Sequence, residues 1–280
     1  MTIGITGATG QLGQLVVQNL KERNTGATIV ALVRDSNKAA SLGVEARVFD
    51  YNRPETLAEA LKGIDKLLLI SGNEIGNRTA QHKNVIEAAK NAGVKLIAYT
   101  SLLHADKSSL VLAGEHLETE TLLKESGIPY VILRHGWYTE NYVGGLGGVV
   151  EHGTFYGSAG NGKIASASRA DFAIVDAEVL VTDGHEGKTY ELAGDEIFTL
   201  SDFTKTLSEV AGKEVNYQNL PVEEYAKVLE DVGLPEDVAQ FYAGTHIGTE
   251  KGDLFDDSKT LSKLIGKPTT SLKAVLKASL

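Results

Sequence analysis

The segment "TGATGQLG", residues 6–13, directly follows the short apolar run of residues 3–5 and overlaps "QLGQLVVQNLKER", which has a helical pattern. Gly7, Gly10 and Gly13 therefore lie between a predicted strand and a predicted helix. Without side chains there, the backbone can turn tightly, a pyrophosphate can approach it, and the helix can pack close to the strand. The helix N-terminus also offers amide donors and a partial positive charge. The segment predicts a cradle for the phosphates of a dinucleotide, although a glycine-rich turn without a ligand has the same local pattern.

The alternation of strand and helix continues along the first half of the chain. Short apolar runs recur between segments that end in glycine, such as "AGEHLETETLLKESG", as is typical of buried parallel strands joined by helices. The predicted strands are Thr2–Thr6, Thr28–Val33, Ala46–Phe49, Lys66–Ile70, Leu96–Thr100 and Tyr130–Arg134. The pattern predicts an α/β fold with a doubly wound parallel sheet of the Rossmann type, whose ligands bind beyond the carboxyl ends of the strands.

The pattern changes after Gly136. The glycine-dense stretch "NYVGGLGGVVEHGTFYGSAGNGK" follows, and the remaining segments, such as "LSDFTKTLSEVAG", are mainly helical. We therefore expect a dinucleotide-binding domain over residues 1–135, with returning segments near residues 165–195. Residues 136–280 are expected to form a smaller, mainly helical lobe on the substrate side.

The composition excludes several classes of partner and site. The net charge is −10 and no basic run occurs, which argues against binding to nucleic acid or to an anionic membrane surface. The chain has no cysteine, and its seven histidines lack the spacing of a metal motif, so no metal site is expected. No apolar stretch reaches the length of a membrane span and no secretory leader is recognisable, so we expect a soluble cytoplasmic protein. The sequence leaves the oligomeric state open, with a homodimer as one outcome.

The end of the second predicted strand indicates which dinucleotide is bound. A carboxylate at this place holds the ribose 2′-hydroxyl of NAD, whereas the 2′-phosphate of NADP requires a cation. The strand is followed by Arg34, with Lys38 one turn later, which favours NADP(H). Against this, Asp35 is able to accept a hydrogen bond from a ribose hydroxyl, and a solvated surface arginine is the alternative interpretation of Arg34.

Several segments resemble one known family. "TGATGQLG" has the G-x-x-G-x-x-G spacing of the extended and atypical short-chain dehydrogenase/reductases. The segments "FDYNRPETLAEAL", "GVKLIAYTS", "GIPYVILRHGWYTEN", "SRADFAIVDAEVL" and "GKTYELAG" extend the resemblance through nearly the whole chain. They look like the NmrA-like branch, and most like its bacterial NADPH:quinone oxidoreductases and triphenylmethane dye reductases. The resemblance implies that Asp50 and Tyr51 lie near the adenine, and Ser71 and Gly72 along the middle of the cofactor.

These observations give one set of candidate NADP(H)-binding residues. It joins the glycine motif, the end of the second strand, the positions implied by the resemblance, and the backbone beyond the sixth strand, which is expected to meet the nicotinamide. The set is Gly7, Thr9, Gly10, Gln11, Leu12, Gly13, Arg34, Asp50, Tyr51, Ser71, Gly72, Gly136 and Trp137.

The catalytic pair of the better-known members of this superfamily is missing. Those enzymes use Tyr-x-x-x-Lys, in which the lysine lowers the pKa of the tyrosine so that the phenol donates a proton. The matching positions here are Leu112 and His116. A carbonyl reduction that needs a general acid is therefore disfavoured, whereas a quinone or cationic dye accepts a hydride with little acid help. His116 either contacts the nicotinamide ribose, steadies a quinone oxygen, or is an ordinary residue on a helix face.

The segment "HGWYTENY" follows the sixth predicted strand, at the edge where substrates bind. We expect Tyr138 and Asn141, together with His116, to shape the acceptor site, and Tyr142 is a further candidate. Packing between lobes is the alternative interpretation for aromatic residues at such irregular spacing.

The expected function is that of an NADPH-dependent oxidoreductase that transfers a hydride to a small flat electrophile, most consistent with a quinone or a cationic dye-like compound. The alternative is a non-catalytic sensor of the NmrA type that binds NADP(H) without turnover, which the missing tyrosine permits equally well. A sugar-nucleotide epimerase is disfavoured because its chemistry needs that tyrosine as a base.

Overall fold

The computed structural model describes residues 1–280, and the chain divides into two compact units. Unit 1 consists of residues 1–106, 112–135 and 169–191, and unit 2 consists of residues 107–111, 136–168 and 192–280. Each unit is discontinuous, because the chain passes between the units several times. No helix combines the length and the apolar character that crossing a membrane requires.

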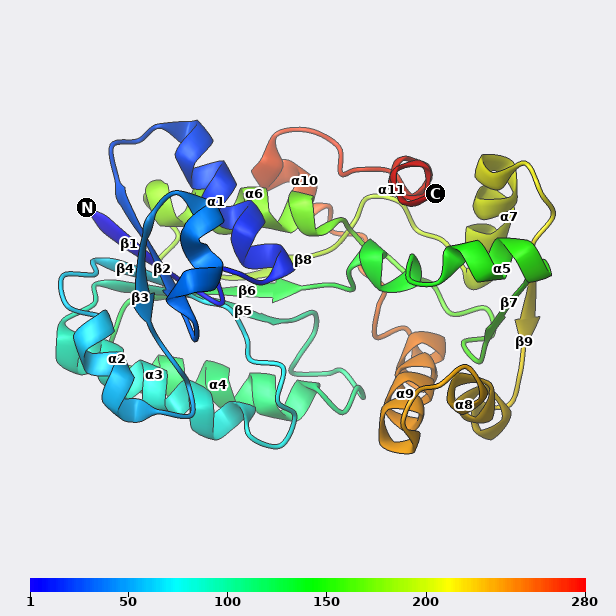
Figure 1. Ribbon diagram of the computed structural model, residues 1–280, viewed down its shortest axis with the longest axis horizontal. Helices are drawn as coiled ribbons and strands as arrows, with labels where there is room; N and C mark the ends of the chain where they lie inside the picture. The colour runs from blue at the N-terminus through cyan, green and yellow to red at the C-terminus, as the bar shows by residue number, and fades with distance from the viewer. The chain divides into compact units, whose positions relative to one another are not determined.

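A seven-stranded sheet forms the centre of unit 1 (Figure 1). Its strand order is β3-β2-β1-β4-β5-β6-β8. The strands are β1 (Thr2–Thr6), β2 (Thr28–Val33), β3 (Glu45–Val48), β4 (Lys66–Leu69), β5 (Leu96–Leu102), β6 (Tyr130–His135) and β8 (Thr189–Leu192). Successive pairs from β3 to β6 are parallel, and the chain order reverses between β1 and β4. The predicted doubly wound parallel sheet is confirmed.

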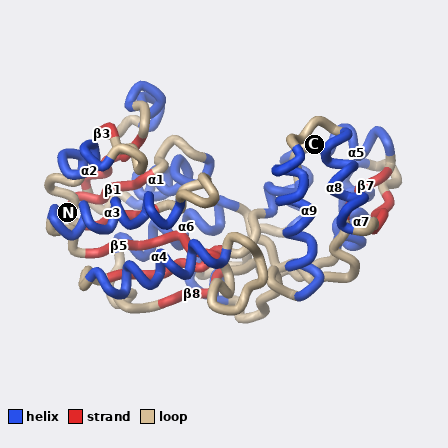
Figure 2. Tube along the Cα trace, turned by 90° about the horizontal axis from the view of Figure 1, so that it is seen from below, coloured by secondary structure: helices blue, strands red, loops and turns tan.

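Helices cover both faces of this sheet. One face carries α1 (Gln11–Arg23) and α6 (Arg169–Val181), which pack on each other. The other carries α2 (Pro54–Ala60), α3 (Arg78–Ala92) and α4 (Ala113–Ser126), and Figure 2 shows α3 and α4 running beside the strands. All seven residues of β5 are buried, because a central parallel strand has helices on both sides. Gly93 and Gly127 end α3 and α4 in the left-handed conformation, as their sequence positions predict.

The sequence-based boundaries match best where the apolar pattern is strongest. The bounds of β1, β2 and α1 are as predicted. Two strands are longer than expected, since β5 continues to Leu102 and β6 to His135. After β2 the chain forms the 3₁₀ helix η1 (Ser36–Leu42). Strand β8 was not predicted as a strand, because its four residues are too few to show a period and only Leu192 is buried.

Unit 2 is mainly helical, as predicted. Figure 1 and Figure 2 both show α8 and α9 side by side. Its elements are the 3₁₀ helix η2 (Thr139–Tyr142), α5 (Leu146–His152), α7 (Leu200–Ala211), α8 (Val222–Asp231), α9 (Glu236–Lys251), α10 (Thr260–Ile265), α11 (Leu272–Ser279), β7 (Thr154–Gly157) and β9 (Asn216–Asn219). The small parallel sheet of β7 and β9 was not predicted, because its strands are short and largely polar.

An ion cluster with a buried centre at Arg134 and Glu120 fixes the end of β6 within unit 1. The Arg134 guanidinium contacts both carboxylate oxygens of Glu120 on α4, at 2.8 Å each. It also contacts Asp106 at 2.5 Å and Glu191 at 2.8 Å. Glu120 is fully buried and accepts a further bond from Ser101. Residues 106 and 191 are each the last of a segment of unit 1, so one side chain ties together three separate parts of this unit.

We predict that Arg134→Met lowers the free energy of unfolding by about 3–5 kcal/mol, because the Glu120 carboxylate stays buried without its main partner. The measurement is urea-induced unfolding followed by circular dichroism. Lys273→Met is the control, since it removes an exposed pair with Glu209 that contributes at most about 1 kcal/mol. A loss in Arg134→Met no larger than in this control would contradict the assigned role.

Candidate functional site

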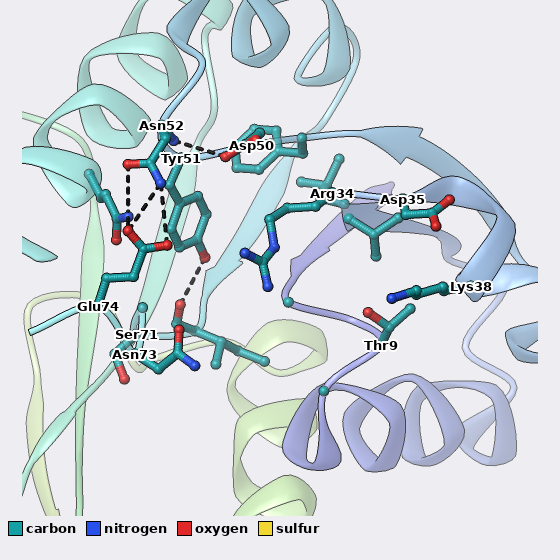
Figure 3. Close-up of a pocket in the computed structure, with 18 residues that line it drawn as sticks. Thr9, Arg34, Asp35, Lys38, Asp50, Tyr51, Asn52, Ser71, Asn73 and Glu74 are labelled. Atoms are coloured by element: carbon teal, nitrogen blue, oxygen red, sulfur yellow. Dashed lines mark hydrogen bonds between the residues drawn. The ribbon is translucent and has the colours of Figure 1, made fainter. Parts of the chain in front are cut away.

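A cleft of about 640 Å³ lies at the carboxyl edge of the sheet in unit 1 (Figure 3). Its walls come from the segments that follow β1, β2, β3 and β4, on both sides of the point where the strand order reverses. Sheets of this type bind their ligands at that point. The lining residues are Gly7, Thr9, Gly10, Leu32, Val33, Arg34, Asp35, Lys38, Phe49, Asp50, Tyr51, Asn52, Ile70, Ser71, Gly72, Asn73, Glu74 and Gln81.

The glycine motif forms the turn between β1 and α1. Gly7 has φ +57°, a conformation that favours glycine, and its carbonyl accepts the Gly10 amide at 2.8 Å. A Cβ atom on Gly13 would lie 2.4 Å from the Gly7 carbonyl oxygen, so the helix packs on the turn as only glycine permits. A Cβ atom on Gly10 would lie 3.1 Å from the same oxygen. Gly7 and Gly13 therefore have the turn and packing geometry that the motif predicts, and the approach of a pyrophosphate at Gly10 stays a prediction.

The N-terminus of α1 is open toward an anion. Its N-cap, Gly10, provides no side-chain cap, and the first turn contains no acidic residue, whereas Lys21 and Arg23 lie in the last turn. The first amide groups therefore keep their hydrogen-bonding capacity and the helix dipole is not neutralised there. Leu12 and Gly13 are buried beneath the turn and, like Gln11, are not part of the cleft wall.

Two cationic side chains without a partner in the chain lie at the end of the cleft that Thr9 lines. Arg34 and Lys38 are both exposed, and neither side chain forms a hydrogen bond or ion pair. Figure 3 shows both side chains on the side of Thr9, directed inward. The carboxylate of Asp35 accepts the Asn37 amide at 3.0 Å and caps η1, so one of its oxygens is already used by the chain. The local charge is therefore suited to an anionic group.

The opposite end of the cleft carries a polar cluster that sequence reasoning missed. The Glu74 carboxylate accepts bonds from Asn52 at 3.1 Å and from Gln81 at 2.9 Å, and Gln81 also donates to the side-chain oxygen Oδ1 of Asn52 at 3.0 Å. These bonds are drawn as dashed lines in Figure 3. Asn52 follows β3 and Glu74 follows β4, so examining every polar residue beyond a predicted strand end would have identified both.

Tyr51 links this end to the sheet. Its hydroxyl lies 2.5 Å from the Thr6 hydroxyl and donates to the Ile70 carbonyl oxygen at 2.8 Å. Burial of this hydroxyl raises the pKa of Tyr51, so it stays protonated. Thr6 also accepts the Ile70 amide at 2.9 Å, which fixes the end of β4 where the wall begins.

Side chains of α3 and α4 hold the backbone of the loop that follows β4. The Gly72 amide donates to His82 Nε2 at 3.0 Å, and the Gly72 carbonyl accepts from Arg78 Nε at 2.8 Å. Glu115 accepts the amides of Gly76 and Arg78 at 3.0 and 3.1 Å. Because side chains on two helices hold its backbone, the loop is ordered before any ligand binds.

His82 on α3 and His116 on α4 are two buried histidines, and His82 contacts this loop directly. His82 contacts the Thr119 hydroxyl at 2.9 Å, and His116 Nδ1 lies 2.7 Å from the Tyr99 hydroxyl. Burial lowers the pKa of His82 to about 3, and burial together with nearby Arg78 holds the pKa of His116 well below its ordinary value. Both imidazoles are therefore neutral at physiological pH.

The remaining predicted site residues belong to unit 2. The Gly136 amide donates to the Leu192 carbonyl oxygen at 2.7 Å, and Tyr138 precedes η2. Asn141 is exposed on η2. The roles of Gly136, Trp137, Tyr138 and Asn141 toward the nicotinamide or an acceptor stay predictions.

Tyr142 belongs instead to an aromatic cluster inside unit 2. Its ring centroid lies 6.3 Å from that of Phe198 and 5.7 Å from that of Phe203. Burial raises the pKa of Tyr142, which is typical of a tyrosine in a core. Tyr142 therefore packs inside unit 2, which differs from both sequence-based alternatives, a substrate wall and packing between lobes.

Comparison with known proteins gives a consistent result. A family model described as NAD(P)H-binding matches residues 7–183. Quinone oxidoreductase 2 of Escherichia coli is 55% identical over 96% of both chains. An NmrA-like family domain-containing oxidoreductase of Aspergillus flavus is 31% identical and covers 79% of this chain and 75% of its own.

Solved structures agree with these relatives. The NADPH-dependent quinone oxidoreductase of E. coli, solved in complex with NADPH, superposes with a TM-score of 0.95 and 53% identity over 99% of both chains. The triphenylmethane reductase of Citrobacter sp., solved with NADP(H), has a TM-score of 0.96 and 42% identity over 99% of this chain and all of its own.

We predict that His82 makes stability fall with acidification. Its folded pKa is about 3 and its unfolded value is near 6.5, so below pH 6.5 only the unfolded chain binds this proton. From pH 7 to pH 5 the unfolding free energy should fall by about 2 kcal/mol through His82, and this decrease should be absent in His82→Gln. The measurement is urea unfolding at both pH values.

Exposed His152 supplies the matched control, and His152→Gln should keep the dependence of the wild type. If His82→Gln also keeps the full dependence, the buried neutral state of His82 is contradicted.

Proposed function

This chain belongs to the NAD(P)H-binding family, and we propose that within it the protein is an NADPH-dependent oxidoreductase that transfers a hydride to a quinone. The resemblance to the NmrA-like branch is confirmed by the relatives described above. The observation that carries the proposal is the cleft of unit 1, where a glycine turn, an open helix N-terminus and two cationic side chains without a partner lie at the same end. The similarity to quinone oxidoreductases supports the choice of acceptor.

The lining residues suggest how the cleft holds the cofactor. The turn at Gly7 and Gly10 and the first amides of α1 bind the pyrophosphate. Arg34 and Lys38 bind the 2′-phosphate, because this group carries up to two negative charges and both cationic side chains lack a partner in the chain. The adenine then lies near Asp50 and Tyr51, and the loop that begins at Ser71 and Gly72 follows the middle of the cofactor.

The protonation states of the buried groups favour an acceptor that needs no strong acid. The pKa values of Tyr51 and Tyr99 are raised by burial, and those of His82 and His116 are lowered. None of these groups is therefore poised to deliver a proton near neutral pH. NADPH supplies a hydride, and a quinone that receives it takes one further proton, here from water, to become a hydroquinone.

The proposed acceptor site involves α4 and the segment that follows β6. His116 with Tyr138 and Asn141 shapes it, and the backbone at Gly136 and Trp137 meets the nicotinamide. The exposed position of Asn141 and the half-buried rings of Trp137 and Tyr138 support this assignment, because part of each residue reaches the molecular surface.

The first test is NADPH consumption with 1,4-benzoquinone, corrected for the uncatalysed reaction. The wild type should show saturable turnover. In Gly10→Ala, the added methyl group would occupy the approach to the pyrophosphate 3.1 Å from the Gly7 oxygen, so kcat/KM for NADPH should fall at least about tenfold.

Gly114→Ala is the matched control, because a methyl group there meets no atom within 4 Å, and its activity should be unchanged. If the wild type shows no turnover while NADPH still raises the melting temperature, the proposed enzyme activity is refuted. The protein then binds NADPH without catalysis.

We predict that Arg34→Ala alters cofactor choice. Loss of the guanidinium should weaken NADPH binding by about 10- to 100-fold, which corresponds to about 1.4–2.7 kcal/mol, and should change NADH binding by less than about threefold. The measurement is isothermal titration with each nucleotide. Arg53→Ala, which removes an exposed arginine outside the cleft wall, should affect neither. Equal losses for NADPH and NADH in Arg34→Ala would exclude a 2′-phosphate contact.

A further inference from the structure

Tyr99 on β5 is fully buried, and its hydroxyl lies 2.7 Å from His116 Nδ1 on α4, with the Thr119 hydroxyl as a further polar neighbour. The two rings are tilted, with centroids 5.9 Å apart. Tyr99 is not part of the cleft wall and no step of the proposed reaction uses it. Its position suggests that it acts on His116.

The direction of this hydrogen bond follows from the buried hydroxyl. Burial raises the pKa of Tyr99, so the phenol keeps its proton. The Thr119 hydroxyl already donates to the Glu115 carbonyl oxygen and contacts His82 Nδ1. His116 Nδ1 is therefore the acceptor for the Tyr99 proton, which would lose this partner if His116 donated through Nδ1. The phenol therefore donates to Nδ1, and the single proton of the neutral imidazole lies on Nε2.

The Nε2 atom of His116 is available to a ligand. It forms no hydrogen bond in the chain, and it is not among the fully buried polar atoms that lack a partner, which are Gln81 Oε1, Ser158 Oγ and Asp176 Oδ2. This atom therefore reaches the molecular surface, although only 5% of the His116 residue is exposed. An N–H group at such a place is suited to an oxygen acceptor.

His82 shows that the fold fixes the opposite tautomer on the neighbouring helix α3. The Gly72 amide is always a donor, so His82 Nε2 must accept, and the proton of His82 lies on Nδ1. This Nδ1–H donates to the Thr119 hydroxyl, which in turn donates to the Glu115 carbonyl oxygen at 2.9 Å. The two neighbouring histidines are therefore held in different states by different partners.

We propose that Tyr99 is a positioning residue that holds His116 in the Nε2–H form, so that a neutral imidazole presents one hydrogen-bond donor to an oxygen atom of a bound ligand. The proposal rests on the proposed function, in which His116 belongs to the acceptor site. The oxygen belongs either to the nicotinamide half of NADPH or to the quinone, and the kinetic arms below distinguish these two sources.

The tautomers are read directly from ¹⁵N-resolved NMR spectra of histidine-labelled wild-type protein. His116 should show a proton on Nε2 and an unprotonated Nδ1, and His82 should show the reverse. In Tyr99→Phe, His116 should become a mixture of tautomers while His82 is unchanged. A wild-type His116 that carries its proton on Nδ1 would overturn the proposal, whatever the enzyme's activity.

A double-mutant cycle separates positioning from a purely structural role. Tyr99→Phe should lower kcat/KM for the quinone about tenfold in the wild type, equivalent to about 1.4 kcal/mol, and should have no further effect in His116→Ala. Equal losses in both backgrounds, or no loss in either, would overturn the proposal. A rise confined to the Kd of NADPH assigns the oxygen to the cofactor, and an unchanged Kd assigns it to the quinone.

Tyr190→Phe is the matched control. Tyr190 also contacts a histidine, His185 Nδ1, at 2.8 Å. His185, however, lies in the loop before β8 and outside the cleft wall. This variant should keep full activity. Absence of quinone turnover in the wild type would refute the proposed function alone, because the NMR spectra still decide whether Tyr99 sets the tautomer.

Discussion

The close contact between α1 and the turn after β1 is the constraint on which the site depends. Gly13 lies so near the Gly7 carbonyl that a Cβ atom would be 2.4 Å from its oxygen. This packing brings the first amides of α1 to the edge of the sheet, without a capping side chain or an acidic residue in front of them. The same edge receives the ends of β2, β3 and β4, so the cations, the aromatic ring and the polar cluster collect around one cleft.

The inner face of α4 shows which residues stand in place of the tyrosine and lysine of the better-known relatives. Leu112 and His116 occupy the matching positions, and four polar residues of this helix have defined partners. Glu115 holds the loop after β4, Thr119 holds His82, Glu120 holds Arg134, and His116 contacts Tyr99. The resulting layer is largely buried and hydrogen bonded, which orders the cleft, and its two buried imidazoles are neutral at physiological pH. A readily reduced acceptor suits such a site.

The sequence predicted the parts of this account that depend on local pattern. The glycine turn, β1, β2 and α1 follow from spacing and apolar period alone, and Arg34 from its place after a strand. Other parts depend on which segments meet in space. The partners of Arg134 come from three separate segments, and the cluster of Asn52, Glu74 and Gln81 joins two loops and a helix. No periodicity encodes such pairings, and strands as short as β8 carry too few residues to show one.

The most direct test of the central claim is a single turnover in which protein saturated with a stoichiometric amount of NADPH is mixed rapidly with quinone. The account predicts that the bound NADPH is oxidised in a quinone-dependent phase, and that this phase slows when the transferred hydrogen of NADPH is replaced by deuterium. Bound NADPH that stays reduced in the presence of quinone would contradict it.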